Sequence, residues 1–186
     1  FRAWYDDKLN PAVKQFKIEL KPLEREYMRA QMELLKNREY YPDANLTLRV
    51  AYGKVCGYSP ADGIQYEPFT TLKGIMDKDN PEIFDYNIPQ KLRDLYAKGG
   101  LEKQPVCILA NNHTTGGNSG SPLIDADGNL IGINFDRVWE GTMSDIAFDP
   151  SFCRNISLDI RYMLFVVDKV GGASHLLDEM VFTDCN

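Results

Sequence analysis

The loop at residues 116–122 (GGNSGSP) contains the residue types that acyl transfer by a serine requires. This chemistry needs an exposed hydroxyl beside backbone N–H groups that can stabilise an oxyanion. Ser119 would supply the hydroxyl, and the N–H groups of Gly117 and Ser119 would supply the donors. Glycine suits such a turn because it has no side chain to block an approach or forbid the conformation. Ser121 is the weaker candidate, because it precedes Pro122 and should already be entering a strand.

Taken by itself, the loop is more simply interpreted as a solvated Gly/Ser turn. The residues that follow it must therefore distinguish such a turn from a loop that carries a catalytic serine. The segment PLID, the turn DADGN with Asp127-Gly128, and the returning segment LIGINF together predict a β-hairpin. A loop of this kind, followed by a strand of the form Leu-hydrophobic-Gly-hydrophobic, resembles the trypsin-like serine peptidases. In those enzymes the end of the returning strand forms a wall of the specificity pocket.

Longer motifs narrow the resemblance. In this order, TGGNSGSP, GINFDRVWEG, SDIAFDP and ISLDIRYMLFVVDKVGGASHLLDEM resemble the C-terminal part of the bacterial serine dipeptidyl peptidases. That family has a large helical domain inserted into a chymotrypsin-type double β-barrel, and YYPDANLTLRVAYGKV resembles its return from the helical domain to the barrel. The resemblance covers essentially residues 39–182. It implies a mostly β fold with some α: the end of a helical domain over residues 1–38, then the C-terminal half of the double barrel with closing helices over residues 39–186.

The resemblance also assigns substrate-binding residues. Arg137 follows Phe135-Asp136, as in the Asp/Glu-specific members of the family, whereas members that prefer apolar residues have a small residue there. It implies that Arg137 binds the acidic side chain, that Asp136 binds the free amine and that Phe135 lies against the substrate. Neighbouring residues of a strand point to opposite faces. Both charged residues can therefore meet the substrate only if the chain bends or leaves the strand near Phe135. The alternative for Arg137 is an ordinary surface arginine.

A serine nucleophile needs a histidine base and an orienting carboxylate. In the resembling family both lie upstream of the helical insertion, so we expect this chain to begin after them and to be inactive alone. We assign neither of its two histidines to catalysis. His113 is expected in the strand that leads into the loop, and His175 in a closing helix. Asn118 stands where many trypsin-like enzymes have an Asp that pairs with a newly freed N-terminus, so activation by that route is not expected.

The N-terminal residues have a helical pattern. Residues 22–37 predict an amphipathic helix with Pro22 in its first turn, preceded by a second helix over residues 14–20. One face of the helix over residues 22–37 carries Leu23, Tyr27, Ala30 and Leu34. This face needs a partner that the chain does not supply, as is expected at the end of a larger helical domain.

After residue 45 the pattern becomes that of β-structure. Leu46, Leu48, Val50 and Tyr52 alternate with polar residues and predict a half-buried strand within residues 46–58. Further strands are expected at residues 105–110 (PVCILA) and 156–160 (ISLDI). Helices are expected at residues 89–98, at residues 161–170, where Gly171-Gly172 would end the helix, and at residues 174–180.

Composition excludes several classes of function. The chain has 186 residues, 44% of them hydrophobic and 26% charged, which is ordinary for a globular protein. A net charge of -6 argues against a nucleic-acid or anionic-membrane surface, and no apolar run approaches the length of a membrane span.

No targeting signal is visible, and the family resemblance implies a periplasmic or secreted location. We expect no cofactor and no metal. Cys56, Cys107, Cys153 and Cys185 are compatible with free thiols or with one or two disulfides.

The leading hypothesis is a serine exopeptidase that releases N-terminal dipeptides with Asp or Glu at the second position. One alternative is a non-catalytic interaction module on a protease-like barrel, which would lack the upstream His and Asp. Another is an endopeptidase specific for acidic residues, which would cut a peptide with a blocked N-terminus. The expected partners are peptides with a free N-terminus, and the sequence leaves the oligomeric state open, a homodimer included.

Overall fold

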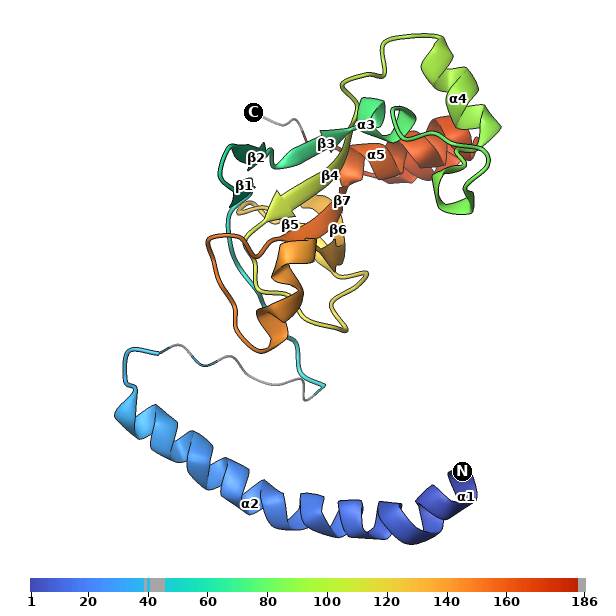
Figure 1. The fold of residues 1–186 in the computed structure, drawn as a ribbon. Helices are drawn as coiled ribbons and strands as arrows, with labels where there is room; N and C mark the ends of the chain where they lie inside the picture. The colour runs from blue at the N-terminus through green and yellow to red at the C-terminus, as the bar shows by residue number, and fades with distance from the viewer. Residues whose placement is uncertain (39, 41–45, 184–186) are drawn as a thin grey trace. The chain divides into compact units, whose positions relative to one another are not determined.

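The computed structural model of the protein describes residues 1–38, 40 and 46–183, which form two compact units, residues 1–48 and 49–186 (Figure 1). The domain boundary expected at residue 38 adjoins residue 39 and residues 41–45, which lie outside the described residues, so that boundary stays a prediction.

The first unit is helical. It consists of α1 (Arg2–Trp4), a π-helical turn (Tyr5–Leu9) and α2 (Asn10–Leu34). Pro22 stands inside α2, so the prediction of two helices meeting there is wrong. Proline in a helix interior removes one backbone hydrogen bond and crowds the preceding turn. The flanking residues are mostly strong helix formers such as Leu, Glu, Lys and Met, and α2 therefore continues through the proline.

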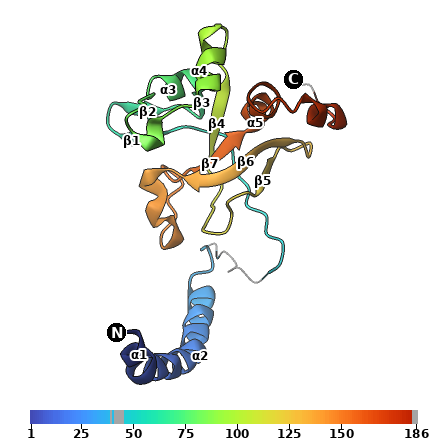
Figure 2. The ribbon, with the colours of Figure 1, turned by 90° about the vertical axis from the view of Figure 1, so that its right-hand side faces the viewer.

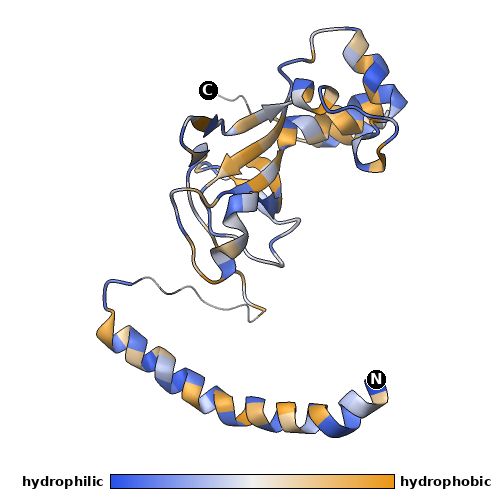
Figure 3. Cartoon of the chain, in the orientation of Figure 1, coloured by the Kyte–Doolittle hydropathy of each residue, from blue (hydrophilic) through white to orange (hydrophobic). Residues whose placement is uncertain are grey.

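α2 has no buried residue. The side chains expected on one apolar face are well exposed, at 65% for Leu23, 68% for Tyr27 and 81% for Leu34. Figure 3 shows apolar and polar residues alternating along the whole helix. A helix of this length gains most of its stability in a protein from burying such a face, so the expectation of a further helical partner stays a prediction.

The second unit is built on antiparallel sheets. A five-stranded sheet has the order β3-β4-β7-β6-β5, and a separate hairpin pairs β1 with β2. The strands are β1 (Tyr58–Ala61), β2 (Ile64–Tyr66), β3 (Phe69–Thr71), β4 (Pro105–Ala110), β5 (Pro122–Ile124), β6 (Leu130–Arg137) and β7 (Asn155–Asp159). The expected strands PVCILA and ISLDI are thus confirmed as β4 and β7. The expected hairpin is confirmed as β5–β6, with Gly128 at φ +88° in its turn.

The strand expected within residues 46–58 is wrong over most of its length. Among these residues the structure has only a bridge between Val55 and Ala110 before β1 begins. Leu48, Val50 and Tyr52 are 81–95% exposed. An alternating pattern can form a strand only beside a neighbour that takes its backbone hydrogen bonds. Here loop side chains take some of them instead: Asn111 Oδ1 accepts from Lys54 N, and Asn112 Nδ2 donates to Ala51 O.

Helices flank the five-stranded sheet. They are α3 (Leu72–Met76), α4 (Gln90–Ala97) and α5 (Ile160–Phe165), which continues as a π-helical turn (Val166–Val170), together with 3₁₀ helices at Phe84–Tyr86, Trp139–Asp145 and Ser174–Glu179. α5 packs beside β4, β6 and β7 (Figure 2). The expected helices at residues 89–98 and 161–170 are confirmed, and the last expected helix is a 3₁₀ helix. No helix in the described residues is long and apolar enough to cross a membrane.

Two apolar clusters hold the second unit together. Beside α3 and α4, the buried side chains of Leu72, Ile88, Leu92 and Val106 pack against one another. A smaller cluster joins β1 to the main sheet and contains Tyr58, Leu109 and Val138. Burial of side chains of this size contributes about 1.5–3 kcal/mol each. The ends of β4 and β6 are therefore fixed where the loop at residues 116–122 meets the sheet.

Candidate active site

The loop that carries Ser119 connects β4 to β5 and is fastened to β6. Gly120 N donates to Asn134 O at 2.7 Å, and Asn134 N donates to Ser121 O at 2.9 Å. Gly117 and Gly120 have φ values of +98° and +85°. This left-handed conformation strains other residues but costs glycine little. The glycines of the motif are therefore needed on both sides of Ser119, as the sequence indicates.

Ser119 is exposed at the tip of this loop, and its Oγ donates to Phe135 O at 3.2 Å. Among the described residues, no hydrogen bond is made by the backbone N–H of Gly117 or of Ser119. Both backbone groups of Ser121, in contrast, are engaged within the loop and with β6. An exposed hydroxyl next to unpaired N–H groups is the arrangement that an oxyanion hole requires.

β6 has a bulge at Phe135. Asn134 pairs with Ser157 and Asp136 pairs with Ile156, so the two steps from Asn134 to Asp136 match a single step on β7. Such a bulge bends the strand and redirects its side chains. The sequence required a bend at this residue if Asp136 and Arg137 were both to face the substrate, and the structure has it there.

The bulge and the loop form one open cleft of about 110 Å³. Its lining contains the predicted nucleophile and all three predicted substrate-binding residues, namely Ser119, Phe135, Asp136 and Arg137, together with Thr114, Thr115, Gly116 and Asn134. The Asp136 carboxylate accepts a hydrogen bond from Arg137 N at 2.8 Å. The structure thus brings together the side chains that the sequence singled out.

The Arg137 guanidinium is held by the 3₁₀ helix Trp139–Asp145. Nη1 and Nη2 donate to the two carboxylate oxygens of Asp145 at 2.8 and 2.6 Å, and Nη1 also donates to Ser144 Oγ at 2.7 Å. These hydrogen bonds lower the pKa of Asp145 from its ordinary value. The Arg137 side chain is 24% exposed and paired in this way, and its role in binding an acidic substrate stays a prediction.

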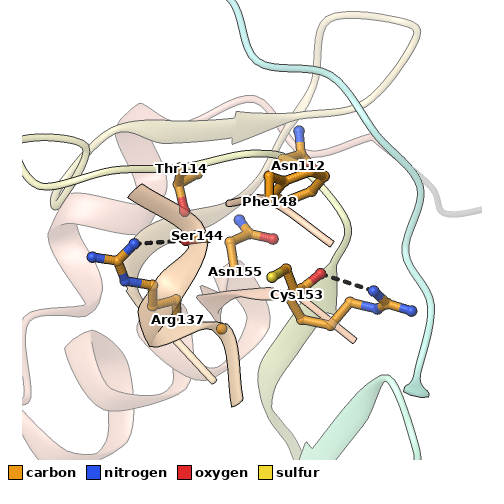
Figure 4. A pocket seen from close by; sticks show the side chains of 9 residues that line it. Asn112, Thr114, Arg137, Ser144, Phe148, Cys153 and Asn155 are labelled. Atoms are coloured by element: carbon orange, nitrogen blue, oxygen red, sulfur yellow. Dashed lines mark hydrogen bonds between the residues drawn. The ribbon is translucent and has the colours of Figure 1, made fainter. Parts of the chain in front are cut away.

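A small cavity lies beside the cleft and shares Thr114 and Arg137 with it. Figure 4 shows the Arg137 guanidinium turned toward Ser144, with Thr114 and Asn155 lining the same cavity. Asn155 is only 2% exposed. Most of its lining residues are polar, with Gly141, Phe148 and Cys153 as the exceptions, and its volume of about 10 Å³ is too small for a side chain of a substrate.

His113 lies beyond the end of β4, so its expected place in the strand is wrong. Its Nε2 is 3.1 Å from Ser144 O, and its ring stacks on Phe148 with centroids 4.5 Å apart. His175 lies in the 3₁₀ helix Ser174–Glu179. The structure therefore gives His113 packing and hydrogen-bonding partners in the segment that holds Arg137.

The described residues contain no group of three or more His, Cys, Asp or Glu side chains that could hold a metal ion. Cys56, Cys107 and Cys153 are free thiols, and Cys185 lies outside the described residues. Burial raises the pKa of the Cys107 thiol, and a thiol that is less readily ionised is a weaker nucleophile.

Sequence reasoning missed two features of the site. Asp145 lies in the motif SDIAFDP, but nothing in the motif identifies Arg137 as its partner. The buried amides of Asn134 and Asn155 were also missed. An Asn inside the apolar run LIGINF was the available signal, because a buried polar side chain in a strand needs a specific partner.

The chain belongs to the peptidase S46 family, whose model matches residues 3–182. It is 54% identical to an Asp/Glu-specific dipeptidyl-peptidase of Flavobacterium psychrophilum, over 95% of this chain and 26% of the relative. It is 42% identical to dipeptidyl-peptidase 7 of Phocaeicola vulgatus, over 98% of this chain and 27% of the relative. The resemblance inferred from the motifs is confirmed.

Solved structures of similar proteins agree with this family membership. The crystal structure of Porphyromonas endodontalis DPP11 in complex with the dipeptide Arg-Asp superposes with a TM-score of 0.86 at 41% identity, covering 95% of this chain and 26% of that one. The same protein with Arg-Glu also gives a TM-score of 0.86. The chain therefore spans about a quarter of the length of the relatives it matches.

Proposed function

We propose that this chain is the C-terminal part of a serine exopeptidase that releases N-terminal dipeptides with Asp or Glu at the second position. The observation that carries the proposal is one cleft that is lined by Ser119, with its exposed hydroxyl, and by Arg137, together with the bulge at Phe135 between Asn134 and Asp136. The dipeptides bound to DPP11 of Porphyromonas endodontalis, Arg-Asp and Arg-Glu, support an acidic second residue.

In the proposed reaction, Ser119 Oγ attacks the carbonyl carbon of the second residue of the substrate. Its proton passes to a histidine base, and the carbonyl oxygen becomes an oxyanion that accepts hydrogen bonds from the N–H groups of Gly117 and Ser119. The C–N bond then breaks as the base protonates the leaving amine, and water hydrolyses the acyl-enzyme. The base and its orienting Asp come from a part of the longer protein upstream of this chain, so the chain alone is inactive.

Recognition uses the two charges of the cleft. The α-ammonium of the substrate has a pKa near ~7.7–8.0 and is largely charged at neutral pH, and Asp136 binds it while Phe135 lies against the dipeptide. Arg137 binds the acidic side chain, because a guanidinium matches a carboxylate with two parallel hydrogen bonds. Exopeptidase action follows from the fixed separation of these two groups from Ser119.

The family resemblance supports the rest of the assignment. The five-stranded sheet of residues 49–186 contributes to the C-terminal half of a chymotrypsin-type double barrel, and the helices of the first unit end a larger helical domain. The location is periplasmic or secreted.

Cleavage by the full-length protein tests this function against its alternatives. Dipeptidyl fluorogenic substrates ending in Asp, Glu, Leu or Ala are compared with the same Asp peptide carrying a blocked N-terminus, and Ser119→Ala is the control. Efficient cleavage of only the free Asp and Glu substrates is expected. Cleavage of the blocked peptide would indicate the endopeptidase, and no serine-dependent cleavage at all would favour the interaction module.

A further inference from the structure

Asn134 touches the nucleophile loop through its side chain as well as its backbone. Its Nδ2 donates to Asn118 O at 3.1 Å. Its backbone N–H and carbonyl are bonded to Ser121 and Gly120. The Asn134 side chain is buried, with the residue 7% exposed. One residue of β6 therefore holds the loop on both sides of Ser119, by backbone bonds after it and by a side-chain bond before it.

The carbonyl that Asn134 binds belongs to the peptide unit whose N–H is the N–H of Ser119. A peptide unit is planar, and in its trans form the C=O and N–H bonds point in opposite directions. Fixing Asn118 O against Asn134 on β6 therefore aims the Ser119 N–H to the other side, toward the open cleft. Ser121 N also donates to Asn118 O at 3.0 Å, so the amide of Asn134 is one of two groups that fix this plane.

A second buried amide orients the first. Asn155 Nδ2 donates to Asn134 Oδ1 at 3.1 Å and lies 3.3 Å from Ser157 Oγ. Because the oxygen of Asn134 is bound in this way, its NH₂ group is left to face Asn118. Asn155 Oδ1 is buried without a hydrogen-bond partner in the described structure. A buried acceptor without a partner is destabilising, so the pair of amides is not explained by stability alone.

We infer that Asn134, oriented by Asn155, is a positioning residue for the oxyanion hole, which it serves by fixing the 118–119 peptide plane. The inference rests on the proposed function, in which Ser119 is the nucleophile. Oxyanion-hole donors act on the transition state and little on the bound substrate. Loss of the Asn134 amide should thus lower kcat and leave KM nearly unchanged.

The test is Asn134→Ala in the full-length enzyme. Outright loss of an oxyanion donor costs about 10²–10³-fold in kcat. Because Ser121 N still holds the carbonyl, we expect a smaller loss of about 10- to 100-fold, with KM within about twofold. The affinity for a dipeptidyl aldehyde ending in Asp, which forms a tetrahedral adduct with the serine, should fall in parallel with kcat. The affinity for the product dipeptide should not change.

The matched control is Asn129→Ala, which removes an amide bonded to Asp125 in the turn of the same hairpin and should leave kcat unchanged. Asn155→Ser should lower kcat less than Asn134→Ala does. If Asn134→Ala no longer binds the product dipeptide, the kcat of Asn155→Ser tests the inference in its place. An unchanged kcat in a variant that still binds the product, or a raised KM with normal kcat, would overturn the inference. Activity retained in Ser119→Ala would instead overturn the proposed function.

Discussion

Arg137 and Asp145 form a two-pronged ion pair, with Nη1–Oδ1 at 2.8 Å and Nη2–Oδ2 at 2.6 Å. In the proposed function, a carboxylate of the protein thus occupies the end of the guanidinium that an acidic substrate would use. The pKa of Asp145 is lowered, chiefly by its hydrogen bonds from Arg137. Asp145 therefore stays ionised in mild acid, and the pair is lost only as the pH falls through this lowered value.

Asp145→Asn should lower KM for substrates ending in Asp or Glu by about three- to tenfold, because a competing carboxylate is removed and a neutral amide pairs with a guanidinium less strongly. Substrates ending in Leu or Ala are the control and should keep their KM. The measurement is KM for the four substrates at neutral pH. A raised KM for the acidic substrates would show instead that Asp145 positions Arg137 for binding.

In wild type, the preference for acidic substrates should fade below about pH 4, where the substrate carboxyl itself becomes protonated. Asp145 should take up its proton at a lower pH than a free carboxyl does, because its hydrogen bonds from Arg137 lower its pKa. A binding titration with the non-hydrolysed product dipeptide, on the wild type and on Asp145→Asn, measures this. If protonation of Asp145 in its pair with Arg137 governed the loss of dipeptide binding, the pH midpoint of that loss would differ between the wild type and Asp145→Asn.

Arg137→Ser should lower kcat/KM for Asp and Glu substrates by roughly 30- to several-thousand-fold. Truncating one partner of a buried charge pair costs on the order of 2–5 kcal/mol. Arg137→Lys keeps the charge without the planar fork and should recover only part of the loss. The measurement that tests this is kcat/KM of the wild type and both variants for matched substrates ending in Asp, Glu, Leu or Ala. An undiminished preference for acidic residues would make Arg137 a structural partner of Asp145 alone.

Ser119 should be the residue modified by a fluorophosphonate probe in the full-length enzyme. Its hydroxyl is exposed and lies beside unpaired N–H groups, whereas the backbone of Ser121 is bound into the loop and to β6. Peptide mapping by mass spectrometry gives the modified site, and Ser121→Ala, which should still be labelled, is the control. Labelling of Ser121, or full activity in Ser119→Ala, would contradict the assignment.

Asp136→Ala should raise KM for free dipeptidyl substrates and reduce kcat, since the substrate amine loses its carboxylate and the scissile bond is held less well. Because Asp136 also accepts a bond from Arg137 N, Asp136→Asn is the matched variant that retains an acceptor but loses the charge. Both variants should be impaired if charge matters. Unchanged kinetics in both would place the amine elsewhere.

Arg154→Leu should destabilise the second unit by about 2 kcal/mol, because it leaves buried and partly buried carbonyls without donors. Arg154 is 7% exposed, and its guanidinium donates to the carbonyls of Gly57, Pro150, Ser151 and Cys153. Thermal unfolding of the full-length protein measures the effect. Lys169→Leu, which removes an exposed pair with Asp168, is the control and should change stability little. Equal melting temperatures for the two variants would contradict the prediction.

Local signals in the sequence were sufficient to predict those parts of the fold that depend on short-range backbone geometry. The glycines around Ser119, the Asp127-Gly128 turn and the apolar runs of β4 and β7 each dictate a short-range backbone geometry, and the structure has it. The need for a bend at Phe135 also followed from the alternation of a strand. Two local patterns misled: Pro22 did not end its helix, and the alternating residues 46–52 form no strand.

The tertiary structure decided which distant groups meet. The sequence marked Arg137 but not its partner Asp145, and it marked the loop but not the amides of Asn134 and Asn155 that hold it. These contacts depend on the register between β6 and β7 and on the path of the 3₁₀ helix after β6. A hydrogen bond between residues far apart in the chain leaves no periodic pattern in the sequence, because its geometry exists only after the strands have paired.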